Sequence, residues 1–295
     1  MTALRVVDAH HHLWSLDVRD QDWITGPELA PIHRDFTVTE LEREARAAGV
    51  AATVLVQTVT VAEETPELLA VAAASDLVAG VVGWTDLTAP DIADTLAALR
   101  AGPGGQWLVG IRHQVQGEPD QRWLERPEVL RGLAAVAAAG LAYDLLVQPH
   151  QLAAATAAAR AVPQLTFVLD HLGKPPVRTG PAEPWTSGLR ALAAQPNTRA
   201  KLSGLVTEAD WHGWTGKDLR PWSDTALEAF GPDRLMFGSD WPVCTLAASY
   251  AEVLATAREL TAALSPDERS HLFSGTAERA YALPPATPTG VPEGR

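Results

Sequence analysis

The sequence has little cysteine, little phenylalanine and tyrosine, and fewer cations than anions. Its 295 residues contain one cysteine, Cys244, so no disulfide can form within the chain, and a reducing, cytoplasmic location is expected. The 23 lysines and arginines against 36 aspartates and glutamates give a formal net charge of −13, which disfavours nucleic acids and anionic membranes as partners. No apolar run is long enough to cross a bilayer, and no basic-then-apolar N-terminal segment predicts secretion.

The chain instead shows a regular alternation of short apolar runs with segments of helical spacing. The predicted strands are 6–14, 50–57, 77–85, 107–113, 141–147, 165–171, 198–204 and 234–240. Eight strands, each followed by helix, predict an α/β fold of the (β/α)₈ TIM-barrel type, with a parallel sheet buried on both faces. A doubly wound open sheet is the alternative, which is disfavoured because no Gly-x-Gly-x-x-Gly follows the first strand.

No linker or internal repeat divides this pattern. Residues 1–283 are therefore expected to form a single catalytic barrel domain. The segment 284–295 is rich in proline, glycine and threonine, and is predicted to be a disordered C-terminal tail.

Three histidines follow the first apolar run. In an extended strand residues i and i+2 share a face, so His10 and His12 are expected to project together while His11 points away. Two neutral imidazoles at the end of a buried strand can share one metal ion. Core histidines bonded to nearby carbonyl groups are the alternative.

Reactive side chains recur at the expected C-terminal ends of later strands, where barrel enzymes carry their active sites. They are Arg112, His113, Gln148, His150, His171, Lys201, Ser203 and Asp240. Substrate contacts are expected from Arg112, His113, Gln148 and His150, and from the tryptophans Trp14 and Trp241. Alternatives stay open, because Arg112 can form a salt bridge at the rim, His113 can turn outward, and His150 can start the next helix.

Asp240 and His171 are the expected catalytic residues. A carboxylate at the end of a buried apolar strand needs a charged partner, or its pKa rises. Facing a metal, Asp240 stays ionised and can ligate the ion or take a proton from water. An N-cap of the following helix is the alternative for Asp240. His171 can orient the substrate or polarise a carbonyl, with a support role held by a backbone carbonyl as its alternative.

The motifs at 8–14, 110–113, 170–175, 201–205 and 237–242, in this order and at barrel spacing, resemble those of the amidohydrolase superfamily. The resemblance covers the chain from Asp8 to about Tyr281 and is strongest to the branch that includes sugar-acid lactonases, of the L-fuconolactone and L-rhamnonolactone type. It implies a hydrolase that opens a lactone ring to the hydroxy acid.

The resemblance also implies a ligand set. His10, His12 and Asp240 would hold one divalent metal, expected to be Zn²⁺, with His171 acting beside it. Many relatives place a histidine or carboxylated lysine on strand five, where Gln148 is expected here, so a two-metal centre is not expected. Some lactonases of this branch work without metal, and metal-independent catalysis is the alternative.

The expected reaction is attack of an activated water on a lactone carbonyl. Asp240 would deprotonate the water, and the metal, or the imidazoles of His10, His12 and His171, would stabilise the developing oxyanion. The alternatives are a metal-dependent non-oxidative decarboxylase, a hydrolase of another lactone such as a dicarboxylate lactone or muconolactone, and a non-catalytic sugar-acid binding protein. A small-molecule lactone is the expected partner, and a homo-oligomer is left open.

Overall fold

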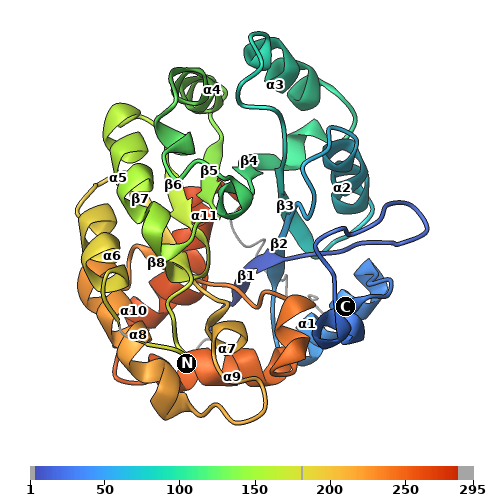
Figure 1. The fold of residues 1–295 in the computed structure, drawn as a ribbon. Helices are drawn as coiled ribbons and strands as arrows, with labels where there is room; N and C mark the ends of the chain where they lie inside the picture. Colours follow the sequence, from blue (N-terminus) through green and yellow to red (C-terminus); the bar gives the residue numbers. More distant parts are fainter. Residues whose placement is uncertain (1–3, 181, 285–295) are drawn as a thin grey trace, which may run out of the picture.

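The centre of the molecule is an eight-stranded parallel sheet that curls into a nearly closed barrel (Figure 1). The computed structural model describes residues 4–180 and 182–284. The strands are β1 (Val7–His11), β2 (Ala52–Val56), β3 (Val78–Gly83), β4 (Leu108–His113), β5 (Ala142–Leu145), β6 (Phe167–Leu169), β7 (Thr198–Leu202) and β8 (Leu235–Phe237). They pair in chain order, and β1 meets the segment that follows β8 through the bridge between His11 and Trp241. The predicted (β/α)₈ barrel is confirmed.

Helices surround the strands, as Figure 1 shows. They are α1 (Val38–Ala47), α2 (Glu64–Ala73), α3 (Ile92–Ala101), α4 (Pro127–Ala138), α5 (Leu152–Ala161), α6 (Trp185–Ala193), α7 (Leu205–Glu208), α8 (Gly216–Phe230), α9 (Tyr250–Leu260), α10 (Pro266–Ser270) and α11 (Thr276–Ala280). Within the described residues, no helix combines the length and the apolar character that a membrane span requires.

Two differences from the expected elements bear on the site. The strand predicted over 141–147 ends at Leu145, so Gln148 lies beyond β5, at the start of a 3₁₀ turn over Pro149–Gln151. The short helix α7, after β7, was not predicted. Of the tail predicted over 284–295, residues 285–295 lie outside the described residues.

A β-bulge in β1 directs the histidines. Asp8 pairs with Thr53 and His11 pairs with Leu55, so three steps along β1 match two along β2. An extra residue in one strand re-aims the side chains that follow it. Val7 and Ala9 pack in the apolar cluster that includes Val54 and Met236, and after the bulge His10 and His12 share one face.

The lower barrel is filled by apolar side chains and closed by the C-terminal segment. Val54, Val168 and Met236 pack there against Tyr281, which follows α11, and Leu283. The Tyr281 hydroxyl donates to both carboxylate oxygens of Asp144 on β5 at 2.9 Å. The apolar part of the barrel interior therefore borders a layer of buried charged residues, which lies between it and the histidines.

Candidate active site

The floor of the candidate site is made of three imidazoles and one carboxylate. The Nε2 atoms of His10 and His12 lie 3.1 Å apart. Asp240 Oδ1 lies 3.7 Å from His10 Nε2, 3.6 Å from His12 Nε2 and 3.8 Å from His171 Nε2. All four residues are buried. Of the residues predicted for the site, these four are brought together, and His11 points away to Thr53 Oγ1 at 2.9 Å.

Strained backbone places two of these side chains. His171 and Leu172 have φ of 50° and 52°, and Asp240 has φ of 59°. Residues other than glycine seldom adopt this left-handed conformation, which costs of order 1–3 kcal/mol and clusters at functional sites. Gly204 leaves room for the His171 ring, since a Cβ there would come within 2.7 Å of it.

Hydrogen bonds fix how the rings face. His12 Nδ1 lies 2.7 Å from the Val56 carbonyl oxygen, an acceptor only, so Nδ1–H donates and Nε2 keeps its lone pair. His171 Nδ1 lies 2.9 Å from Ser203 Oγ. Burial lowers the pKa of His171 to about 4, although Asp240 and Asp170 act in the opposite direction. The ring is therefore neutral at physiological pH.

Asp240 is a buried carboxylate that remains ionised. Burial alone would raise its pKa, but the neighbouring imidazoles of His171 and His12 outweigh burial, so the pKa lies below its ordinary value. An ionised carboxylate facing imidazole nitrogens can ligate a cation or accept a proton from water.

A layer of buried charge lies under the floor. Lys201 Nζ lies 2.5 Å from Asp144 Oδ2 and 2.9 Å from Asp170 Oδ1, and Arg112 Nη1 donates to Asp170 Oδ2 at 2.9 Å. All four side chains are buried. Burial raises the pKa of Asp144 to about 6, with Lys201 opposing the rise. For Asp170 burial acts in the same direction, but Lys201 and His10 bring its pKa well below the ordinary value.

The buried carboxylate of Asp8 joins the strand that carries the histidines to the loop that carries Asp240. Asp8 accepts hydrogen bonds from the backbone nitrogens of His10 and Ser239, the Ser239 hydroxyl and the Tyr250 hydroxyl. The Asp240 nitrogen in turn donates to the His10 carbonyl at 2.8 Å. This network ties β1 to the loop after β8, so it holds Asp240 opposite the histidines.

The donor set at the floor fits a single divalent metal. Four ligands at about 2.0–2.1 Å in a tetrahedron lie about 3.4 Å apart, close to the observed separations of 3.1, 3.6 and 3.7 Å among His10 Nε2, His12 Nε2 and Asp240 Oδ1. His10 must then carry its proton on Nδ1. Asp170 Oδ1, 3.3 Å from that nitrogen and 2.9 Å from Lys201 Nζ, can accept that proton. Lys201 Nζ, which lies 3.0 Å from the same His10 nitrogen, then donates to the carboxylates of Asp144 and Asp170 instead.

The floor opens into an inner cavity of about 240 Å³. The side chains that line it are His12, Trp23, Leu29, Thr58, Arg112, Gln114, Gln116, Leu146, His171, Lys174, Thr207, Glu208, Trp211, Asp240, Val243 and Leu246. An outer cavity of about 650 Å³ adjoins it and includes Gln148 and Pro149. Trp23 and Leu29 come from the long loop after β1.

Several residues expected to contact substrate lie elsewhere. His113 stacks on Trp123 with ring centroids 4.3 Å apart, and its ring nitrogens bond Glu118 and Trp84. His150 is exposed. This placement does not support direct substrate contact by either histidine.

Gln148 was predicted to occupy the place on strand five where many relatives carry a metal ligand, and this prediction is wrong. Gln148 follows the end of β5 and lines the outer cavity, while the ionisable residue within β5 is Asp144. Extending β5 by two apolar residues produced this error.

The predicted tryptophans pack beside the site rather than in it. Trp14 and Trp241 both pack edge-on against Phe36, at centroid distances of 5.2 and 5.3 Å, and neither lines the inner cavity. The two tryptophans that do line it, Trp23 and Trp211, were not predicted.

Arg112 lines the inner cavity, but its donors face inward. They bond Gln57 and Asp170, and Nη1 lies 3.5 Å from His10 Nε2. The alternative of a salt bridge therefore describes its contacts better than a fork held open for a substrate carboxylate.

Sequence comparison then places the chain among known proteins. The family model described as Amidohydrolase matches residues 7–283. The chain belongs to the amidohydrolase family.

The amidohydrolase relatives match over nearly their whole length. A protein named L-fucono-1,5-lactonase from Burkholderia multivorans is 43% identical over 295 residues, which cover 96% of this chain and 98% of that protein. One of the same name from Burkholderia ambifaria is 38% identical over 284 residues, covering 94% and 95%. A crystal structure of a Burkholderia multivorans amidohydrolase with bound zinc has a TM-score of 0.88 at 42% identity, covering 95% of this chain and 100% of that one.

Proposed function

We propose that this amidohydrolase opens a sugar lactone, of the L-fucono-1,5-lactone type, to the hydroxy acid. The observation that carries the proposal is an ionised, buried carboxylate, Asp240, set 3.6–3.8 Å from three imidazole nitrogens at the floor of the inner cavity. Similarity over nearly the full length to two proteins named L-fucono-1,5-lactonase supports this substrate class. The decarboxylase and the other lactones considered from the sequence are not favoured.

In the proposed reaction Asp240 takes a proton from the attacking water. The hydroxide adds to the lactone carbonyl carbon, the ring C–O bond then breaks, and the ring oxygen leaves as the hydroxyl of the product acid. General-base assistance of this kind contributes about 10²–10⁴-fold to the rate. His171 is neutral, is held by Ser203, and faces Asp240, so it can hydrogen-bond the developing oxyanion or return the proton to the leaving oxygen.

His10, His12 and Asp240 would hold a divalent metal, for which we propose Zn²⁺. When bound, such an ion polarises a carbonyl as a Lewis acid. Arg112 and Asp170 position His10 from beneath. The single catalytic domain and the cytoplasmic location remain predictions from the sequence. Whether the protein forms a homo-oligomer remains an open question.

The test is proton release from a panel of lactones, measured before and after chelation. The panel pairs neutral L-fucono-1,5-lactone and L-rhamnono-γ-lactone with an anionic dicarboxylate lactone. Hydrolysis of a neutral sugar lactone supports the proposal, and its loss on chelation, with recovery on adding Zn²⁺, supports the metal. Turnover that survives chelation would move carbonyl activation to His10, His12 and Arg112. No turnover of any sugar lactone would overturn the proposed function.

A further inference from the structure

The inner and outer cavities meet at a ring of residues that belongs to both. This ring, called the neck below, consists of Lys174, Thr207, Glu208, Trp211 and Leu246. Two of the five are ionisable. A ligand that extends from the inner cavity into the outer one therefore contacts these residues.

Lys174 and Glu208 face each other across the neck without a direct hydrogen bond. Lys174 Nζ lies 3.8 Å from Glu208 Oε1, and the two side chains are 22% and 27% exposed. Within the described residues, neither side chain makes a hydrogen bond. Both therefore retain their full capacity to bond a ligand, one as donor and the other as acceptor.

The backbone places this pair with the same loops that carry His171. Lys174 has φ of 53° and ends the left-handed run that begins at His171. Glu208 is the last residue of α7, which begins next to Gly204, the residue that makes room for the His171 ring. Strain of this kind persists where the surrounding structure imposes it, and it clusters at ligand sites.

The charges around the inner cavity favour a neutral ligand. Its two cationic side chains in the described lining are Arg112 and Lys174, and each has its own carboxylate partner, Asp170 and Glu208. The remaining ionised group is Asp240. Among the described residues that line the inner cavity, no uncompensated cation is therefore available to a substrate carboxylate.

We propose that Lys174 and Glu208 recognise a ring hydroxyl of a neutral lactone and disfavour the anionic product. A hydroxyl can donate to the Glu208 carboxylate while accepting from the Lys174 ammonium, so one oxygen satisfies both. Ring opening converts the neutral lactone to a carboxylate beside Asp240 and in the field of Glu208, which promotes release. The inference rests on the proposed lactonase function and assigns specificity within the same site.

The test compares two constants in Glu208→Gln, namely KM for L-fucono-1,5-lactone and the inhibition constant Ki of its hydroxy-acid product. The variant keeps the shape of the side chain and removes its charge. KM is expected to rise about tenfold with kcat within about threefold, because a charge-assisted hydrogen bond is weakened in the ground state and the transition state alike. Product Ki is expected to rise less than KM, because the same change also removes repulsion of the anion.

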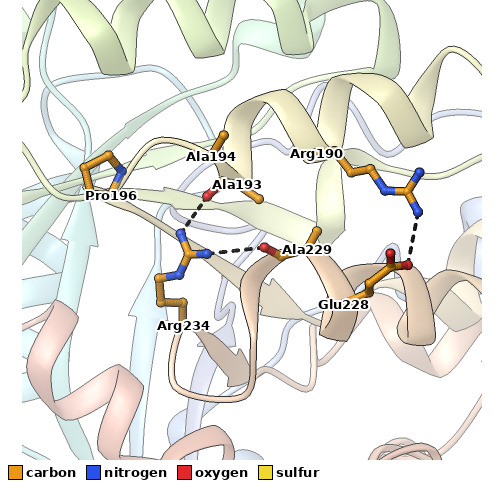
Figure 2. A pocket seen from close by; sticks show the side chains of 7 residues that line it. All are labelled: Arg190, Ala193, Ala194, Pro196, Glu228, Ala229 and Arg234. Atoms are coloured by element: carbon orange, nitrogen blue, oxygen red, sulfur yellow. Dashed lines mark hydrogen bonds and ion pairs between the residues drawn. The ribbon is translucent and has the colours of Figure 1, made fainter.

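Lys174→Met is expected to change the ratio Ki/KM in the opposite direction. It removes a hydroxyl donor and also the cation nearest the product, so product Ki is expected to rise more than KM. The matched control is Glu228→Gln in the Arg190–Glu228 ion pair, which lies on a separate surface cavity between α6 and α8, where the atoms are 3.0 Å apart (Figure 2). It should leave KM and Ki within about twofold of wild type, since exposed ion pairs contribute little.

Each outcome decides the inference. Opposite changes of the Ki/KM ratio in the two neck variants support it. Equal changes of KM and Ki, or no change, overturn it and leave the lactonase proposal standing. A wild-type protein that turns over no sugar lactone overturns the lactonase proposal, and the inference falls with it. Thermal melts of all three variants separate a folding defect, which would lower active-site concentration, from a change in either constant.

Discussion

Replacing Asp240 by asparagine tests the proposed base with little disturbance of the fold. Asparagine has nearly the same shape and tolerates the left-handed conformation, φ 59°, that Asp240 adopts. Alanine in that conformation would add strain of about 1–2 kcal/mol. The asparagine variant is therefore expected to melt near the wild-type temperature, and Asp240→Ala to melt below it.

The rate effect follows from the absence of a substitute base. Of the other described carboxylates near the floor, Asp170 faces Arg112, Lys201 and His10. Asp8 is held by Ser239 and Tyr250, and Glu208 lies at the neck opposite Lys174. Loss of general-base assistance costs about 10²–10⁴ in rate, or about 3–5 kcal/mol of activation free energy. Initial rates of proton release from L-fucono-1,5-lactone, with Zn²⁺ in excess to offset a weaker ligand, would measure the loss in kcat. A kcat for Asp240→Asn within tenfold of wild type would sink the assignment.

Three further predictions concern the layers beneath and around Asp240. Lys201→Met leaves Asp144 and Asp170 without their shared cation, so urea unfolding should show a free energy of unfolding lower by about 3–5 kcal/mol. The double variant with Asp144→Asn should recover part of this loss. A single variant as stable as wild type would contradict the buried pairing. Tyr281→Phe removes one hydroxyl donor to Asp144 and should cost about 1 kcal/mol in thermal unfolding without changing KM; a changed KM would mean that the barrel base reaches the site. Titration calorimetry should find one Zn²⁺ bound per wild-type chain. His12→Ala removes one of three proposed ligands, so the variant should bind Zn²⁺ much more weakly. Equal affinity in both proteins would place the ion elsewhere.

The fold could be predicted because its signal is local. Strands β2, β3, β6 and β8 are almost entirely apolar and buried, which is typical of a parallel sheet covered on both faces. The rule that barrel active sites lie at the C-terminal strand ends then selected His10, His12, His171 and Asp240 from nine histidines and 36 acids.

The charge layer could not be predicted in the same way. Asp144 lies in the middle of an apolar strand, and its partners Lys201 and Tyr281 are 57 and 137 residues away in the sequence. A buried carboxylate in such a strand signals that a partner exists. Only the closed barrel shows that one ammonium serves Asp144 and Asp170 together.

The wrong predictions of substrate-contacting residues had two causes. One was a misplaced strand end, and the other was the assumption that residues next to site residues in the sequence also enter the site. Leu146 and Val147 continue the apolar run of β5 past its last paired residue, which moved Gln148 onto the strand. Trp14 and Trp241 adjoin site residues in the sequence, but their rings pack on Phe36 instead. Trp23 and Trp211 lie in loops whose course depends on contacts between distant segments.

The most direct test of the account is one turnover in ¹⁸O-labelled water, with enzyme in excess over L-fucono-1,5-lactone. If Asp240 acts as a general base, the first product carries one ¹⁸O in its carboxylate and the peptide containing Asp240 stays unlabelled by mass spectrometry. An unlabelled first product together with ¹⁸O in Asp240 would mean that the carboxylate itself attacks the carbonyl. That result would contradict the proposed attack by activated water.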